Sequence, residues 1–215
     1  EQARALAEAL QDESRLAQVL YWLGRVHYVR AELPTVIAYA QQSLTIADRL
    51  ADDTLAAPPV NLMGRVYYFL SDYANASRML ARSAEQMRRL GNTVEEATAT
   101  GSAGVAYGYL GEFERALAYA DRGVQLAQES QNPFAETAAH FYRALVHQQR
   151  GSWKPAIADC ETALRIAERV KDSFRIYALT CYAGWAQAMA GDLAKGRMLL
   201  EAGIALAEQL GTKLF

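Results

Sequence analysis

Small and apolar residues recur along the chain at the spacing of one helix face. Positions separated as i, i+4, i+7, i+8 and i+11 lie on one side of an α-helix. This spacing is occupied by Ala116, Ala120, Gly123, Val124 and Ala127, and forty residues later by Ala156, Cys160, Ala163, Leu164 and Ala167. The pattern therefore predicts amphipathic helices that return every forty residues.

The forty-residue period extends over most of the chain. One column contains only small residues, namely Gly24, Gly64, Gly104, Ala144 and Gly184. The column nine positions later contains large residues, namely Leu33, Tyr73, Phe113, Trp153 and Leu193. A glycine inside a helix costs up to about 1 kcal/mol relative to alanine, so a recurring one needs a packing reason. Small residues at these positions indicate helices that cross at the close end of the usual range.

Each period contains two helical patterns of roughly 16 residues, separated by short breaks such as "GEFE" at Gly111 and "GSWK" at Gly151. Glycine there suits a left-handed helix end. The predicted fold is an all-α solenoid of antiparallel helical hairpins, because no single hairpin can bury both its faces. We expect one array over residues 1–215, divided into the end of a truncated repeat (1–12) and five repeats (13–52, 53–92, 93–132, 133–172 and 173–215).

The repeat resembles the tetratricopeptide repeat family, in which a small residue precedes an aromatic one and is followed by alanine in the second helix. The series Gly64–Tyr67–Ala76 and Gly104–Tyr107–Ala116 carry this resemblance. The period exceeds the usual ~34 residues, so the chain is similar to long-helix variants found in large multidomain bacterial regulators. HEAT and armadillo repeats have a comparable period but lack the column of small residues. The resemblance implies a right-handed superhelix.

Two features of the chain are less regular. Pro58 and Pro59 fall a turn inside the helix predicted near residue 53, so we expect that helix to begin at Pro58, with Ala57 near its cap. A hinge after the first repeat is the alternative. Neither end of the sequence has a polar capping helix, so we expect the native protein to continue in both directions.

Composition and charge restrict the function. The net charge of -2 and the pI near 6.0 disfavour a general nucleic-acid binder. No apolar run approaches the ~18 residues of a membrane span, and no signal peptide is visible. The two cysteines, Cys160 and Cys181, fit a reducing compartment, so a cytoplasmic location is expected.

Catalytic chemistry is not indicated. His140 and His147 are seven residues apart, which differs from the i, i+4 spacing of a metalloprotease pair, and are expected to be packed or half-exposed. Acidic pairs such as Glu95–Glu96 lie at repeat junctions, where helix N-termini favour negative charge. We expect Cys160 to be buried and inert, whereas Cys181 could be a reactive thiol. The sequence predicts no enzyme, no cofactor and no metal site.

The resemblance implies that a partner lies in a concave groove lined by one face of the first helices. Within each helix the corresponding residues are three, four or seven apart, hence on one face. Val105, Gln148 and Cys181 share this face. The predicted partner-binding residues are Tyr21, Arg25, Tyr28, Asn61, Arg65, Tyr68, Phe69, Tyr109, Phe141, Leu145, Trp185 and Met189. Tyr67, Tyr107, Tyr73, Phe113 and Trp153 fall between helices and are expected in the core.

Arg25 and Arg65 occupy equivalent positions in adjacent repeats, where they could grip carboxylates between tyrosine rings. Alternatively, they pair with junction acids such as Glu32 or Asp72, or are solvated. Some family members bind a chaperone tail with a Lys/Asn/Arg set, of which only Asn61 with Arg65 is present.

Together these features favour a non-catalytic module that binds a peptide or protein segment, with no nucleic-acid or membrane partner. One alternative is a self-associating spacer that forms homo-oligomers through its uncapped ends. A less favoured alternative is an enzyme with its site between helices.

Overall fold

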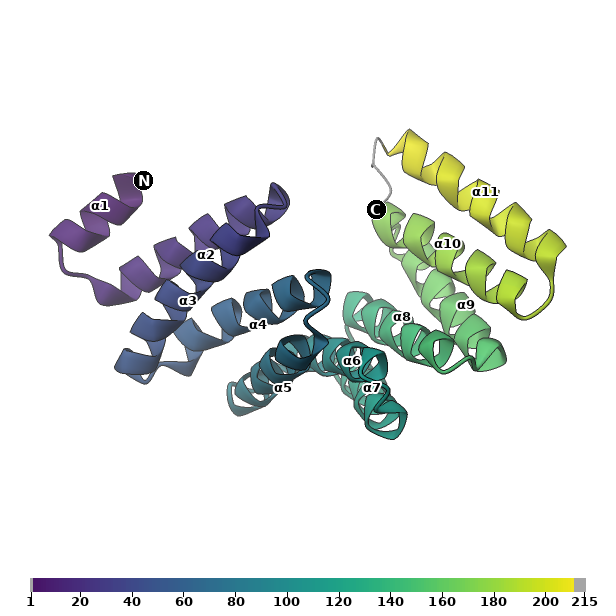
Figure 1. Ribbon diagram of the computed structural model, residues 1–215, viewed down its shortest axis with the longest axis horizontal. Helices are drawn as coiled ribbons and strands as arrows, with labels where there is room; N and C mark the ends of the chain where they lie inside the picture. Colours follow the sequence, from purple (N-terminus) through teal and green to yellow (C-terminus); the bar gives the residue numbers. More distant parts are fainter. Residues whose placement is uncertain (1, 211–215) are drawn as a thin grey trace. The chain divides into compact units, whose positions relative to one another are not determined.

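The computed structural model describes residues 2–210, apart from the side chain of Val29. In this part of the chain all regular structure is helical (Figure 1). The helices form two compact units, residues 1–92 and 93–215, which are described separately. The predicted fold class, an all-α solenoid of antiparallel hairpins, is confirmed. Residue 1 and residues 211–215, which belong to the first and last predicted segments, lie outside the described residues.

The first unit contains a short helix followed by two helical hairpins. Its helices are α1 (Gln2–Ala9), α2 (Glu13–Val29), α3 (Leu33–Leu50), α4 (Asp53–Phe69) and α5 (Tyr73–Arg89). Helix α2 packs on α3 and α4 packs on α5 within the hairpins, while α3 packs on α4 between them. The core lies where these faces meet and includes Val36, Leu44, Val60 and Met63.

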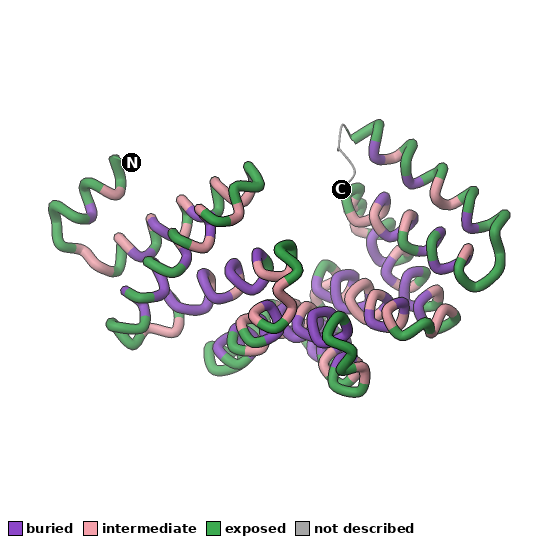
Figure 2. The backbone as a smooth tube through the Cα atoms, viewed as in Figure 1, coloured by how far each residue is buried: buried purple, intermediate pink, exposed green. Residues whose placement is uncertain are grey.

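The second unit contains three hairpins of the same kind. Its helices are α6 (Thr93–Tyr109), α7 (Phe113–Glu129), α8 (Pro133–Gln149), α9 (Trp153–Arg169), α10 (Ser173–Met189) and α11 (Leu193–Gln209). Consecutive helices pack antiparallel, and α6 also packs on α8. Figure 2 shows buried positions along the faces that meet and exposed positions at the connections.

Helices α1 to α10 are each followed within two residues by a residue in the left-handed conformation, and these residues recur every twenty positions. They are Gln11, Ala31, Ala51, Ser71, Gly91, Gly111, Gln131, Gly151, Lys171 and Gly191. The amide of the residue that follows donates a hydrogen bond to a carbonyl of the preceding helix, as Asp72 N does to Tyr67 O (2.9 Å). A polar side chain then caps many of the following helices. Asp52, for example, accepts hydrogen bonds from the amides of Thr54 and Leu55.

The small residues of this column lie where two helices pack closely, as the sequence predicts. A Cβ atom on Gly104 would lie 2.8 Å from the carbonyl oxygen of Ala116, and one on Gly184 would lie 2.9 Å from that of Gly196. In each case the two residues belong to the two helices of one hairpin. The helix backbones are therefore in direct contact at the small residue.

The expected start of the fourth helix at Pro58 is wrong. Helix α4 begins at Asp53 and continues through Pro58 and Pro59. The two prolines remove two backbone donors from the first turns. Asp52 compensates by capping the helix, and burial of Leu55 and neighbouring residues in the first core stabilises the turn that precedes the prolines.

Candidate partner-binding surfaces

Two guanidinium groups of the first unit lie against aromatic rings. Arg25 donates a hydrogen bond from Nη1 to the Tyr21 hydroxyl (3.0 Å) and lies 5.8 Å from the centre of the Trp22 ring. Arg65 lies 5.3 Å from the centre of the Tyr28 ring. The Tyr28 ring in turn contacts Phe69, with ring centres 6.2 Å apart. We call this surface the N-terminal patch, formed by Tyr21, Trp22, Arg25 and Tyr28 of α2 with Arg65 and Phe69 of α4.

Arg25 and Arg65 form no ion pair with any carboxylate of the described residues. Most other arginines of the first unit do, namely Arg4, Arg15, Arg49, Arg82, Arg88 and Arg89. The acids considered as partners are engaged elsewhere. Glu32 contacts His27, and Asp72 accepts hydrogen bonds from Asn75 at the start of α5. The pairing alternative is therefore wrong, and both guanidiniums keep N–H donors available.

Asn61 and Tyr68, predicted on the same surface, serve the packing between α4 and α5. Asn61 donates from Nδ2 to the Ser83 hydroxyl (3.3 Å). The Tyr68 ring is half-buried against Phe69 and Tyr73. The Asn61 amide is thus engaged with α5.

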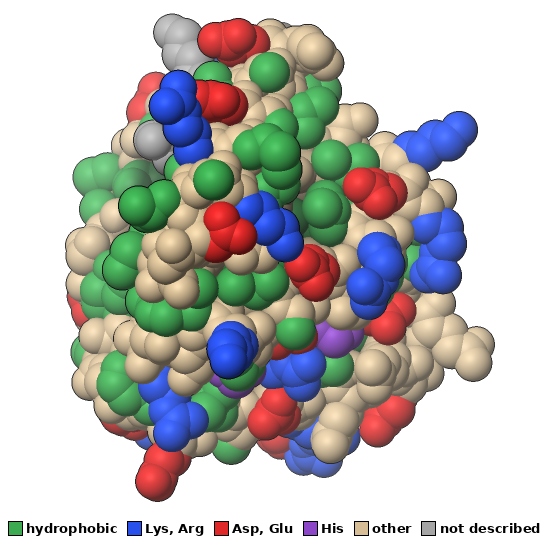
Figure 3. All heavy atoms as spheres, turned by 90° about the vertical axis from the view of Figure 1, so that its right-hand side faces the viewer, with side chains coloured by type: hydrophobic (Ala, Val, Ile, Leu, Met, Phe, Trp, Pro, Cys, Tyr) green, Lys and Arg blue, Asp and Glu red, His purple; other side chains and the backbone are tan. Residues whose placement is uncertain are grey.

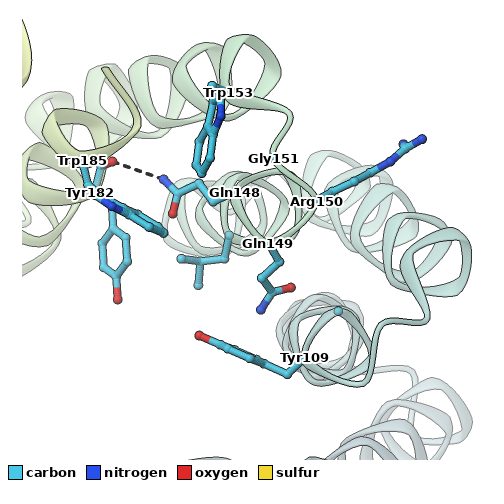
Figure 4. Close-up of a pocket in the computed structure, with 10 residues that line it drawn as sticks. Tyr109, Gln148, Gln149, Arg150, Gly151, Trp153, Tyr182 and Trp185 are labelled. Atoms are coloured by element: carbon cyan, nitrogen blue, oxygen red, sulfur yellow. Dashed lines mark hydrogen bonds between the residues drawn. The ribbon is translucent and has the colours of Figure 1, made fainter. Parts of the chain in front are cut away.

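A hollow of about 630 Å³ lies in the second unit where the C-terminal ends of α6 and α8 meet α10 and the start of α9 (Figure 4). We call it the C-terminal hollow. It is lined by Gly108, Tyr109, Leu145, Gln148, Gln149, Arg150, Gly151, Trp153, Tyr182 and Trp185. Apart from Arg150, which extends away from the rings, its side chains are uncharged.

Two glutamine amides of the hollow have fixed orientations. Gln148 donates from Nε2 to the carbonyl oxygen of Tyr182 (3.2 Å), and Gln149 donates from Nε2 to that of Val105 (3.3 Å). A backbone carbonyl only accepts hydrogen bonds, so neither amide can be flipped. The Oε1 atoms of both residues are buried and accept no hydrogen bond from the described residues.

Aromatic rings surround these amides. The rings of Trp153 and Trp185 meet edge to face, with centres 5.7 Å apart, and the Tyr182 ring packs in the same way on Phe141 (5.0 Å). Burial raises the pKa of Tyr182, and the neighbouring Tyr109 hydroxyl adds to this shift. The Tyr182 phenol therefore stays protonated at neutral pH, and the hollow has polar atoms but no negative charge.

The predicted residues of the last three repeats have different places in the structure. Tyr109, Leu145 and Trp185 line the hollow, as does Gln148. Phe141 packs instead in a core cluster with Leu179. Val105 is buried, and Met189 is exposed outside the hollow.

Sequence reasoning missed Gln149, Arg150, Trp153 and Tyr182. Gln149 lies four residues after Leu145, so helical spacing alone could have found it. Trp153 was expected in the core, but it is half-buried and lines the hollow.

A buried ionic cluster joins α7, α8 and α9. Asp159 accepts hydrogen bonds from Arg143 (2.7 and 2.8 Å) and contacts His140 Nδ1 (2.8 Å), while Arg143 also reaches Asp121 (3.0 Å). Burial by itself would raise the pKa of Asp159, but the hydrogen bonds from His140 and Arg143 outweigh it and lower that pKa. Burial lowers the pKa of His147, whose Nε2 lies 3.8 Å from Asp159. The cluster is a structural link between adjacent hairpins.

The cysteines do not have the environment of reactive thiols. Burial raises the pKa of Cys160 to about 12, and burial also raises the pKa of Cys181, which packs against Gly203 of α11. Thiolate character is therefore disfavoured at both positions. Among the described residues, no group of three or more His, Cys, Asp and Glu side chains could hold a metal ion. Each helix in this part of the chain is too short or too polar to cross a membrane.

The outer face of α11 carries several exposed hydrophobic side chains among its charged ones. Ile204 is 44% exposed, whereas Leu44 and Val124, at the equivalent positions of earlier second helices, are 3% and 5% exposed. Leu193 and Met198 are also exposed. Hydrophobic side chains gather between scattered charges on this side of the molecule (Figure 3).

Comparison with known proteins supports the repeat assignment. A tetratricopeptide repeat family model matches residues 54–129. BtubC (BKLC) from P. vanneervenii is 16% identical, with a TM-score of 0.75 over 100% of this chain and 89% of its own. Comparison with curated protein sequences gives no match.

Two peptide complexes have similar structures. A Rap protein complexed with competence and sporulation factor is 14% identical, with a TM-score of 0.79 over 91% of this chain and 54% of its own. The Rap conjugation gene regulator of plasmid pLS20, in complex with the Phr* peptide, is 15% identical, with a TM-score of 0.77 over 95% and 57%. This chain therefore spans little more than half the length of either Rap protein. At these identities the likeness shows the fold. Residues 54–129 thus match the tetratricopeptide repeat family, and the chain has the fold of the solved helical repeat proteins to which it is similar.

Proposed function

We propose that this protein is a non-catalytic interaction module that binds an acidic segment of a partner protein at the N-terminal patch. The observation that carries the proposal is the contrast among the arginines of the first unit. Six of the ten pair with carboxylates. Of the four that form no ion pair with the described residues, Arg25 and Arg65 are the two whose guanidinium groups lie on aromatic rings. Two peptide complexes among the similar structures are consistent with a peptide ligand.

The geometry suits carboxylates for a physical reason. A guanidinium offers five N–H donors in a rigid fork that matches a carboxylate. The rings of Trp22 and Tyr28 hold the two forks in place, which reduces the entropy lost on binding. Arginines stacked on aromatic rings can also bind nucleic acids, but the net charge of -2 disfavours a nucleic-acid ligand here.

The test is selection and titration of peptides against the whole chain. Random dodecapeptides displayed on phage are selected, and the strongest binder is titrated by fluorescence anisotropy. We expect acidic sequences and an affinity that falls with added salt. The R25E/R65E double variant should bind at least ~100-fold more weakly, because each charge-assisted hydrogen bond contributes about 1.5–3 kcal/mol.

The matched control is R165E/R169E, which makes the same charge change on exposed positions of α9 in the second unit. It should bind as tightly as the wild type. Full binding by R25E/R65E with unchanged helical circular dichroism would refute the proposal, as would selection of basic or neutral peptides. Preferential binding of an oligonucleotide would favour nucleic acid instead.

The outer face of α11 favours self-association as a second candidate function. Ile204 belongs to a column that is buried at Leu44, Ala84 and Val124 and half-buried at Leu164. Light scattering across a concentration series tests this idea. A mass that rises with concentration and falls to the monomer value in I204K would support it, and a monomer at all concentrations would exclude it.

A further inference from the structure

We propose that copies of this chain associate head to tail, with α11 of one copy packed against α2 of the next. The proposal rests on the self-association named above as the second candidate function, and it specifies both sides of the contact. One side is the outer face of α11. The other side is a stripe on α2 formed by Val19, Leu23 and Val26, which we call the receiving stripe.

The receiving stripe is a helix face that is buried elsewhere in the chain. Its members are spaced i, i+4 and i+7, so they lie on one side of α2. Val19 and Leu23 are half-buried, and Val26 is 50% exposed. The residues at the position of Val26 in the four later first helices are all 0% exposed, namely Val66, Ala106, Val146 and Ala186. A face that is covered in four repeats is therefore open on α2.

The length of the preceding second helix explains this difference. Helix α4 packs on α3, which has 18 residues, and Val66 belongs to the same core cluster as Val36 of α3. Helix α1, which precedes α2, has 8 residues, whereas α11 has 17 (Figure 1). At a rise of 1.5 Å per residue α1 is about 12 Å long, so it reaches only the first half of α2. The second half, with Val26, is the part that a complete second helix covers.

Helix α11 is a complete second helix whose end has nearly the same sequence as α1. Residues 5–10 read ALAEAL, and residues 205–210 read ALAEQL. The structure already shows this sequence packed on α2, because α1 lies there with Ala7 buried. One difference favours α11. Arg4 of α1 forms an exposed ion pair, whereas α11 has Ile204 at the same position of the repeat. Helix α11 therefore suits α2 better than α1 does, and in the assembly it takes the place of α1.

The contact covers apolar side chains on both copies. Ile204 is 44% exposed, and Trp22, which neighbours Leu23 on α2, is 61% exposed. Removal of this apolar surface from water drives association. The charges of Arg197 and Glu201 on α11 pair with each other (2.7 Å), so neither needs a partner on the second copy. Because the two sides differ, each associated pair keeps one free α2 and one free α11 at its ends.

The test mixes two variants that each block one side of the contact. V26K places a charge on the receiving stripe, and I204K places one on α11, where association would desolvate it. Light scattering should show each variant alone associating at least ~10-fold more weakly than the wild type. An equimolar mixture should form a 1:1 dimer, because the I204K copy still offers its α2 and the V26K copy still offers its α11. Both positions are exposed, so both variants should keep the helical circular dichroism of the wild type.

Trp22 gives an independent readout. The chain has three tryptophans, so Trp22 is the only one left in W153F/W185F. Its quenching by acrylamide should fall as the concentration of this protein rises, because α11 of another copy shields it. Added I204K should abolish that protection, although Ile204 and Trp22 belong to different units of one copy.

L70K and L110K are the matched controls, because Leu70 and Leu110 are leucines of similar exposure, one in each unit, that lie outside the contact. Both should associate as the wild type does. A mixture of V26K and I204K that stays monomeric would overturn the proposal. So would wild-type association by V26K, which would indicate a contact between two α11 faces and leave the second candidate function standing. A wild type that is monomeric at all concentrations would remove both. Val26 and Ile204 are not part of the N-terminal patch, so the acidic-segment proposal is tested separately by its peptide titration.

Discussion

The column of small residues makes a quantitative prediction about stability, in which the same substitution has opposite signs at two repeats. A glycine inside a helix is less favourable than alanine by about 0.8–1 kcal/mol. At Gly24 an added Cβ would lie 3.4 Å from the nearest atom, Leu62 Cδ2, which is ordinary contact. G24A should therefore raise the free energy of unfolding of the first unit by about 0.5–1 kcal/mol.

At Gly104 the same methyl group would lie 2.8 Å from the Ala116 carbonyl oxygen and 3.1 Å from the Ala120 amide nitrogen. These are backbone atoms of the facing helix, so relief requires α6 and α7 to move apart. Overpacking of this kind costs typically about 1–3 kcal/mol. After the gain in helix propensity, G104A should lower the free energy of unfolding of the second unit by up to about 2 kcal/mol.

The assay is urea denaturation of each single variant, followed by far-ultraviolet circular dichroism and by tryptophan fluorescence. Fluorescence of Trp22 follows the first unit, and that of Trp153 and Trp185 follows the second. G184A is a further check, because its Cβ would lie 2.9 Å from backbone atoms of α11, so it should also destabilise. If G104A and G184A raise the midpoint as G24A does, helix propensity alone explains the column and the close-crossing argument fails.

Two further predictions concern the titratable cluster and the connections. Hydrogen bonds lower the pKa of Asp159 in the folded state, and burial lowers the pKa of His147. Both groups therefore stabilise the folded state at neutral pH, and this stabilisation is lost on acidification. Between pH 7 and pH 5 the urea midpoint of the second unit should fall, and H147Q should flatten that slope; an unchanged slope would show that His147 does not titrate there. Ala51 ends α3 at φ 51°, and because this conformation is strained for alanine, A51G should raise the melting temperature of the first unit by a few degrees, whereas A47G, inside the same helix, should lower it.

Some residues of each candidate surface could be predicted from the sequence. Helical spacing placed Tyr21, Arg25 and Tyr28 on one face, and the contacts of the N-terminal patch agree with that prediction. The same reasoning placed Tyr109, Leu145 and Trp185 on a candidate partner-binding face, and in the structure all three line the hollow. It could not distinguish Phe141 from the surface residues, because Phe141 has the same spacing but packs in a core cluster. Spacing fixes the side of a helix, whereas a neighbouring helix decides which part of that side is covered.

The sequence by itself determined the repeat, the helices and, apart from the start of α4, their approximate ends. These depend on local chemistry: apolar spacing, capping side chains and small residues occur at fixed positions in each forty-residue period. Tertiary structure alone decided three other features. It kept α4 helical through Pro58, because the preceding turn is buried in the core. It left Arg25 and Arg65 without an ion pair among the described residues, and it brought Gln148, Gln149, Trp153 and Tyr182 together. Each of these features involves residues from different helices, and their distances are set by how those helices pack.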